Sequence, residues 1–362
     1  MIPVISLLFI LIIYTNVFAQ AKQGNSNTAI PKVWGNVFGD YFYKAGGDSS
    51  FNNLVYSKYK KDFNAFAFRR VNLGVDYAIN ETFDTRVSIS YDGPDTLSNG
   101  NFAVYVRDAF ITWKNIFKNS NLTFGIMPTP GYVYISEKWW TYRSIEQTIL
   151  GQRNILGSRD FGITLSGTFD DAKNFGYYAM IGNGRGTRLE NNKYKKFYAT
   201  LFGYFMKKKM VASLYSDYES SGNDQSKTTP SAFIGYQSNS ITLGLENFFQ
   251  FQKNFNTSNT AESPDIVPYG MSFFVIPTLM KDQLKLFLRY DFYNPDINNS
   301  STNNPSTGFN QSFFTAGLDF IPFTNVHIMP NLWLNAFTAK PNQTTIETTD
   351  VVPRITFWYD YK

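Results

Sequence analysis

The chain has 362 residues, with 33 Lys and Arg against 28 Asp and Glu, a formal net charge of +5, one His and no Cys. The absence of Cys excludes disulfides, thiolate metal sites and a cysteine nucleophile. The charge surplus is mild and no basic cluster is interleaved with aromatic residues, so no nucleic acid is expected as a partner. Aromatic residues make up 18% of the chain, yet no apolar run near 18 residues follows the N-terminal segment, so no helix is expected to span a membrane.

The N-terminus predicts a secretory signal peptide. Residues 2–13 are apolar and uncharged, and the later Val17-Phe18-Ala19 has small residues where a signal peptidase cuts. The run is shorter than the roughly 20 residues that a spanning helix needs. We therefore expect a cleaved signal peptide at 1–19, a short N-terminal segment at 20–31 and the folded domain at 32–362.

Apolar and polar residues alternate along many stretches of the remaining chain. The alternation is clean in FDTRVSISYD at 83–92, in LKLFLRYDF at 284–292 and in RITFWYDY at 354–361. Period-two alternation predicts strands with one apolar face. Sixteen such stretches are expected, at about 32–44, 66–79, 83–92, 102–114, 122–127, 158–169, 175–182, 194–206, 210–218, 231–237, 241–253, 268–276, 283–293, 311–320, 326–337 and 351–361.

The connections between these strands alternate between long and short. Long polar segments such as 45–65 and 294–310 are separated by tight ones such as NET at 80–82 and KKK at 207–209. This regularity predicts an all-β fold: a transmembrane antiparallel β-barrel of about 16 strands, with long extracellular loops, short periplasmic turns and outer-membrane lipids around its apolar face. Fourteen or eighteen strands remain open. A soluble β-sandwich is the competing interpretation, but it gives no reason for the alternation in length.

Several motifs resemble the bacterial outer-membrane porins of the phosphate-selective porin O and P type. They are FRRVNLGVDYAINETFDTRVSISYD at 68–92, VRDAFITWK at 106–114, LTFGIMPTP at 122–130 with EKWWTYRSIEQTI at 137–149, and SRDFGITLSG at 158–167. The resemblance implies a water-filled channel in the bacterial outer membrane for small hydrophilic solutes or anions. It also implies a homotrimer, and a third long loop that folds into the lumen and narrows it.

Counting the connections independently makes 128–157 the third long one. Its aromatic and aliphatic residues are too many for a loop surrounded by water, so we expect it to enter the lumen. An alternative is that it packs over the mouth or at a subunit contact. The residues expected at the channel constriction are Lys138, Trp140, Tyr142, Arg143, Arg153 and Arg159.

Charged residues in the inward phase are expected to pair across the barrel wall. If the tight turn at 80–82 sets the register, Asp76 lies opposite Arg86 and Arg70 lies opposite Asp92. Asp291 beside Arg289 and Asp360 near Arg354 indicate the same mixture of charges. The expected lumen-wall residues are thus Arg70, Asp76, Arg86, Asp92, Arg289 and Arg354. Because these pairs nearly cancel, the surplus of one cation in the third loop predicts only a mild preference for anions, phosphate among them.

Other functions have weaker support. A track formed by Trp139, Trp140 and Tyr142 would favour a carbohydrate-selective porin, and inward-pointing Phe287 and Trp333 would favour an apolar ligand. An outer-membrane hydrolase needs a His-bearing constellation, and the single His327 has no partner motif beside it. One His without Cys leaves only carboxylates for a metal. No catalytic residue, metal or cofactor is therefore expected.

Overall fold

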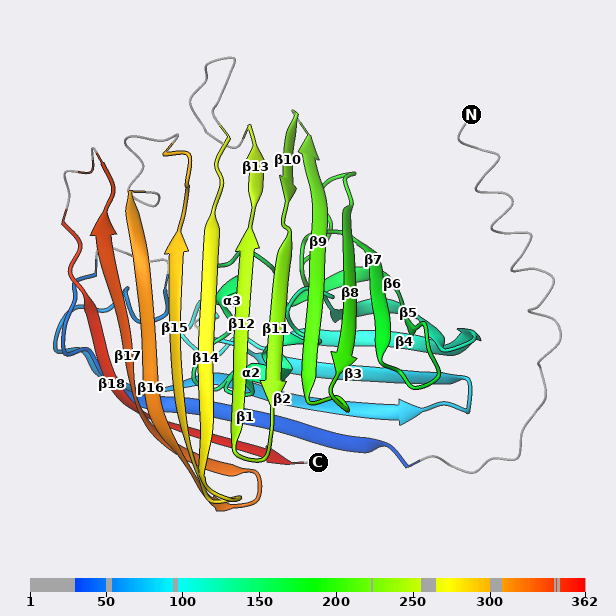
Figure 1. The fold of residues 1–362 in the computed structure, drawn as a ribbon, viewed down its shortest axis with the longest axis horizontal. Coiled ribbons are helices and arrows are strands. Elements are labelled where there is room, and N and C mark those ends of the chain that lie inside the picture. Colours follow the sequence, from blue (N-terminus) through cyan, green and yellow to red (C-terminus); the bar gives the residue numbers. More distant parts are fainter. Residues whose placement is uncertain are drawn as a thin grey trace. The chain divides into compact units, whose positions relative to one another are not determined.

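The alternating segments form the strands of one closed antiparallel sheet (Figure 1). The computed structural model describes residues 30–49, 54–93, 97–222, 224–254, 265–299, 308–341, 343 and 346–361. Consecutive strands pair along the chain, and β1 (Lys32–Tyr43) pairs with β18 (Asp350–Tyr361), which closes the barrel. The expected signal peptide at 1–19, and all of the 20–31 segment except its last two residues, lie outside the described residues.

The described residues contain eighteen strands. In two places, two successive strands are parts of one wall-spanning strand that is interrupted by one or two residues. Residues 229–230 separate β10 from β11, and Gln250 separates β12 from β13. Subtracting these two interruptions from eighteen gives sixteen crossing strands, so the expected fold and strand number are confirmed. The remaining strands are β2 (Asn64–Ala78), β3 (Phe83–Tyr91), β4 (Tyr105–Phe117), β5 (Ser120–Pro128), β6 (Arg159–Thr168), β7 (Phe175–Gly182), β8 (Lys196–Phe205), β9 (Met210–Gly222), β10 (Gln225–Thr228), β11 (Ser231–Gln237), β12 (Ile241–Phe249), β13 (Phe251–Lys253), β14 (Tyr269–Met280), β15 (Leu284–Asn294), β16 (Phe309–Phe323) and β17 (Val326–Ala339).

The two ends of the barrel differ in the length of their connections. Tight turns such as 118–119 and 324–325 lie at one end, and longer connections such as 44–63 and 129–158 lie at the other. One connection expected to be long, 219–230, instead continues the sheet as a hairpin, because β10 pairs with β9 on one side and with β13 on the other. The expected strand 102–114 is observed at Tyr105–Phe117.

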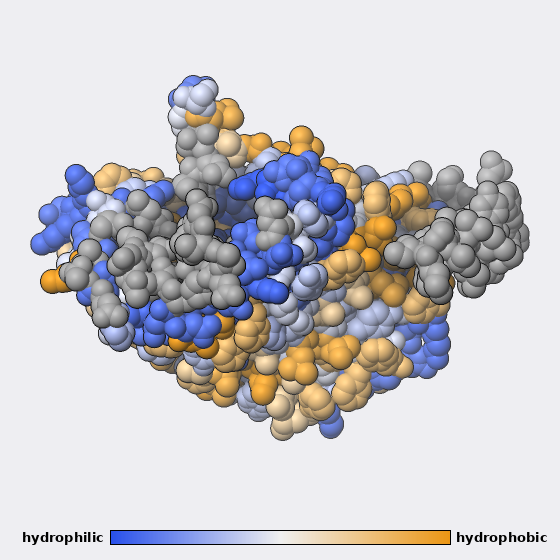
Figure 2. Space-filling model, turned by 90° about the horizontal axis from the view of Figure 1, so that it is seen from above, coloured by the Kyte–Doolittle hydropathy of each residue, from blue (hydrophilic) through white to orange (hydrophobic). Residues whose placement is uncertain are grey.

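The two faces of the sheet meet different surroundings. Outward residues such as Ile355, Phe357 and Tyr359 on β18 alternate with inward ones such as Arg354 and Thr356, which are buried. Figure 2 shows hydrophobic residues along the flank, whereas hydrophilic residues gather over the end that is uppermost in Figure 1. The apolar face thus points out of the barrel, the reverse of a soluble sandwich. No helix within the described ranges is both long and apolar enough to cross a membrane.

Candidate channel constriction

Residues 129–158, between β5 and β6, lie inside the barrel and are called the inserted segment here. It contains two short helices, α2 (Ser136–Trp140) and α3 (Ile149–Gln152). The hydroxyl of Ser136 donates to Glu246 on β12 at 2.6 Å, and the hydroxyl of Tyr142 donates to Asp319 on β16 at 2.9 Å. The segment therefore reaches inward-facing groups on two strands that β14 and β15 separate.

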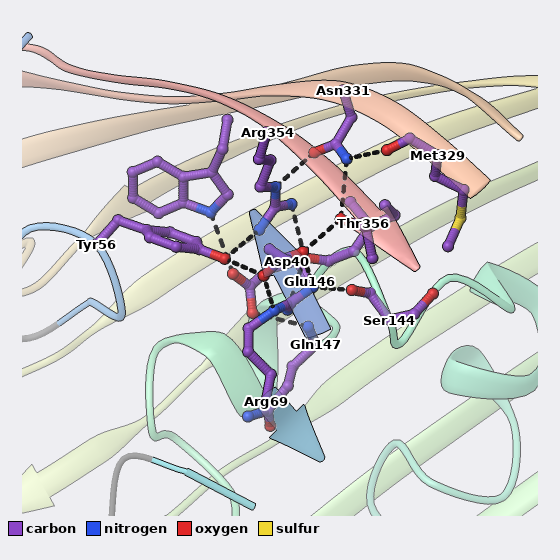
Figure 3. A network of polar contacts seen from close by, with 12 residues as sticks. Asp40, Tyr56, Arg69, Ser144, Glu146, Gln147, Met329, Asn331, Arg354 and Thr356 are labelled. Atoms are coloured by element: carbon purple, nitrogen blue, oxygen red, sulfur yellow. Dashed lines mark hydrogen bonds and ion pairs between the residues drawn. The ribbon is translucent and has the colours of Figure 1, made fainter. Parts of the chain in front are cut away.

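A polar network fixes the middle of the inserted segment to the seam where the barrel closes (Figure 3). Arg69 donates to the carbonyl oxygens of Ser144 and Ile145, and Arg354 donates to the Ile145 carbonyl at 2.8 Å. Asp40 accepts hydrogen bonds from Arg69 and Tyr56. Arginines from β2 and β18 thus satisfy backbone carbonyls that would otherwise be buried without partners, and Asp40 on β1 holds the Arg69 guanidinium in place.

The inserted segment has one apolar side, which packs against β7–β17. Trp140 contacts the ring of Phe274, with ring centroids 5.2 Å apart, and Tyr142 contacts Phe287 at 4.7 Å. Its buried apolar residues are Tyr132, Ile135, Trp139, Trp140, Tyr142, Ile145, Ile149, Leu150, Ile155 and Leu156. The apolar side chains of the segment thus face β7–β17 and leave the side nearest β2–β6 to other groups.

Charged groups gather on that remaining side. Asp92 is shared by Arg70, whose Nε lies 2.6 Å away, and by Arg107, whose Nη1 lies 2.5 Å away. Arg159 pairs with Asp108 at 2.6 Å. We call Arg70, Arg107, Arg143 and Arg159, with Asp92, Asp108 and Glu137, the arginine cluster.

Arg143 is the member of the cluster that the inserted segment contributes. Its Nε lies 4.0 Å from Glu137, a looser pairing than those on the wall. Its guanidinium lies over the ring of Phe38 at 5.8 Å, where Arg69 and Arg70 each lie at 5.3 Å. A cavity of about 230 Å³ beside it is lined by Tyr59, Arg69, Asp92, Arg143, Glu146 and others. Arg143 is thus the less neutralised of the two arginines beside this cavity, Arg69 being paired with Asp40.

Two β-bulges turn additional charges inward. Between β1 and β2 the register shifts so that Arg69 has no partner, and between β3 and β4 it shifts at Arg107. A bulge places two successive side chains on one face. As a result Arg69 joins Arg70 inside, and Arg107 joins Asp108 inside.

The bulged residues were missed by the sequence analysis, although the sequence carries a signal for them. Outward apolar residues are spaced by two along a regular strand, but Phe68 and Val71 are both outward and spaced by three. The same shift separates Val106 from Ala109, so the phase of the outward residues changes within the expected strand 102–114. Asp40 and Asp108 were also missed as members of the interior.

The expected constriction residues occupy three different environments. Lys138 is exposed, with its Nζ 5.7 Å from the ring of Tyr134. Trp140 and Tyr142 are buried in the packing already described. Arg153 is also buried, donating to Gln311 at 2.5 Å and to Asn335 at 3.1 Å. Only Arg143 and Arg159 lie in the arginine cluster.

The expected wall pairs are present, with one difference. Arg86 lies 2.6 Å from Asp76, and Arg289 lies 2.5 Å from Asp291 while also donating to the Gln147 carbonyl of the inserted segment. Arg354 does not pair with Asp360. Asp360 accepts hydrogen bonds from Asn36 and Trp358 instead, because Arg354 extends toward the inserted segment.

The single histidine is held by packing. His327 lies 2.8 Å from Asp319 through its Nδ1 and stacks on Trp358 at 4.1 Å. Asp319 also accepts the hydrogen bond of the Tyr142 hydroxyl, through its other carboxylate oxygen. Within the described ranges no group of three or more His, Cys, Asp or Glu residues could hold a metal ion.

The fold is that of the outer-membrane porins. The outer membrane channel DcaP of Acinetobacter baumannii aligns with 94% of this chain and all of its own, at 14% identity and a TM-score of 0.66. OmpF of Salmonella typhi, solved with daunomycin, aligns with 92% of this chain and all of its own, at 12% identity and 0.63.

An anion-selective porin from Comamonas acidovorans aligns with 92% of this chain and all of its own, at 9% identity and a TM-score of 0.61. At these identities the likeness concerns the fold alone. No protein-family model and no curated protein matches the sequence.

Proposed function

We propose that the protein is an outer-membrane porin, a passive water-filled channel for small hydrophilic solutes. The apolar outer face, the polar interior and the porin fold support this function together. The observation that carries the proposal is the asymmetry of the inserted segment. Its apolar side is packed against one wall, and its Arg143 faces the charged strands β2–β6, where water and ions would pass.

A mild anion preference follows from the charges along this path. The cations are Lys58, Arg69, Arg70, Arg86, Arg107, Arg143 and Arg159, and the anions are Asp40, Asp76, Asp92, Asp108, Glu137 and Glu146, which gives seven minus six, a surplus of one. Low-dielectric walls reduce screening, so this surplus acts more strongly than it would at the mouth. Phosphate would pass as one anion among others, because most of the arginines are already paired.

Single-channel recording in a planar bilayer tests the proposal. We expect stepwise, ohmic conductance and a reversal potential of mild anion preference in a KCl gradient. Replacing His327 by Ala should leave the conductance unchanged. Failure of the reconstituted protein to conduct would reject the porin function.

The residues that would have favoured a carbohydrate porin, an apolar-ligand pathway or an enzyme have other roles in this fold. Trp139, Trp140 and Tyr142, which would have formed a sugar-binding track, are buried against the wall. Phe287 and Trp333 point inward, as an apolar-ligand pathway would need, but both are fully covered. His327 is engaged by Asp319 and Trp358, which supports a packing role and a protein that is not an enzyme.

Export through a signal peptide cleaved after Ala19, residence in the bacterial outer membrane and assembly as a homotrimer complete the proposal. N-terminal sequencing of the mature protein tests the cleavage site. Native mass spectrometry in detergent tests the trimer, and a monomer under mild conditions would contradict it. We also propose, from the sequence motifs at 68–167, that the protein belongs to the phosphate-selective porins.

A further inference from the structure

The outer face of the barrel carries an apolar groove across β7, β8, β9 and β11. It has a volume of about 640 Å³ and lies in the half of the barrel nearest the short turns. Gly203 on β8 pairs directly with Ala212 on β9, so two adjacent outward positions have almost no side chain. Larger side chains form the sides of the groove, among them Phe175, Leu201, Phe205 and Ile234.

A cluster of three lysines lies at the end of the same hairpin. The turn between β8 and β9 contains Lys207, Lys208 and Lys209, all exposed to solvent. No salt bridge among the described residues involves any of the three. Gly203 precedes Lys207 by four residues, which places the groove about 13 Å along the strand from the turn.

We propose that the groove and this lysine turn together bind one anionic phospholipid of the surrounding bilayer, with an acyl chain in the groove and the phosphate at the lysines. The inference rests on the barrel's proposed place in a membrane, and it goes beyond conduction. The groove walls are apolar, which suits a hydrocarbon chain, and at one place the Phe175 and Phe205 rings contact each other edge to face, with centroids 5.7 Å apart. Lipid phosphates lie at the membrane surface, where the turn would also lie.

Charge complementarity favours the anionic lipid over a zwitterionic one. No carboxylate in the described part of the chain forms a salt bridge with these lysines, and basic clusters at a membrane surface attract anionic headgroups. A second copy of the chain is the other occupant that an apolar outer groove could accept. The lipid is preferred because the apolar groove and the charged turn lie on the same β8–β9 hairpin, matching the two chemical ends of a phospholipid.

Native mass spectrometry of the full-length protein in neutral detergent tests the proposal, with dioleoyl phosphatidylglycerol and dioleoyl phosphatidylcholine added at equal concentration. We expect phosphatidylglycerol to be retained on the order of tenfold more than phosphatidylcholine at low salt, and less so at high salt. The readout does not depend on conductance, so it can fail while the porin function stands. Equal retention of the two lipids would overturn the proposal.

Two variants separate the headgroup from the chain. Changing Lys207, Lys208 and Lys209 together to Gln should reduce phosphatidylglycerol retention to the phosphatidylcholine level. Its matched control changes Lys60, Lys61 and Lys193 to Gln on the long connections and should change nothing. An unchanged preference in the turn variant, or the same loss in the control, would reject the site.

Filling the groove provides the second test. Ala212→Phe places a ring in the groove, whereas Ala179→Phe places one on the outer face of β7 at a position that does not line it. We expect only the first to lower retention of both lipids, with oligomeric mass unchanged. Loss of the oligomer in Ala212→Phe, with lipid retention intact, would show that a second copy occupies the groove.

Discussion

The carboxylate of Asp92 is shared by two arginines, and the Nη1 atom of Arg107 lies 2.5 Å from its Oδ2 atom. Arg70 binds the other oxygen at 2.6 Å. This sharing is possible only because Arg107 is a bulged residue, turned inward beside Asp108. A single carboxylate therefore neutralises charge on two strands at the proposed constriction.

Asp92→Asn should increase anion preference. It removes one negative charge beside Arg70 and Arg107, and roughly 0.5–1 kcal/mol of screened Coulomb energy corresponds to about a two- to fivefold change in the permeability ratio. Leaving the two arginines less well paired should also cost about 2 kcal/mol of stability. Reversal potentials in a KCl gradient and thermal unfolding check the two effects. Asp171→Asn, at an exposed turn where Asp171 pairs with Lys118, is the control that should alter neither.

Arg143→Glu should change the ion selectivity, whereas Arg153→Glu should mainly change the stability, although the sequence analysis predicted the same role for both residues. Arg143 borders the cavity beside Asp92, so its reversal should shift the reversal potential toward cations. Arg153 is buried among Gln311 and Asn335, so its reversal should mainly lower the unfolding temperature, at a cost of about 3 kcal/mol. Selectivity and stability measured on both variants check the assignment. A selectivity shift confined to Arg153→Glu would show that the water path runs on the other side of the inserted segment.

Tyr142→Phe should loosen the inserted segment. It removes a buried hydrogen bond to Asp319 and should cost about 1–3 kcal/mol. A less firmly held segment should give noisier open-channel current, which single-channel recording measures directly. Tyr290→Phe removes a hydroxyl contact with Ser312 on the outer face and should leave the current noise unaltered. Equal noise in Tyr142→Phe and the wild type would mean that the other contacts hold the segment.

Deleting Arg107 should be tolerated, whereas deleting Ile111 should not. Removing the extra residue of the bulge restores regular alternation, so the apolar face of β4 still points outward. Removing Ile111 shifts the phase within the strand and turns apolar residues inward on one side of the deletion. Heat-modifiable migration on gels reports barrel formation. Loss of the barrel in both deletions would show that the bulge itself is required for assembly.

The alternation of residues was sufficient to predict the barrel from the sequence. Each strand has period two, and a bilayer-facing barrel requires an apolar residue at every second position, so the signal is local and repeats sixteen times. The register across the turn at 80–82 was also local, which is why the pairing of Asp76 with Arg86 could be derived. The bulges are also visible in the sequence, because outward apolar residues are spaced by three there and not by two.

The interior could not be derived in the same way. Burial of Trp140 and Tyr142 follows from walls contributed by β14 and β15, and Arg354 reaches the Ile145 carbonyl across 209 positions of the chain. Such contacts depend on how the barrel closes, which no local pattern encodes. Arg143 and Arg153 have the same charge, and the local sequence does not distinguish them. The tertiary structure places Arg143 beside a cavity and buries Arg153 among Gln311 and Asn335, because each side chain meets a different part of the barrel wall.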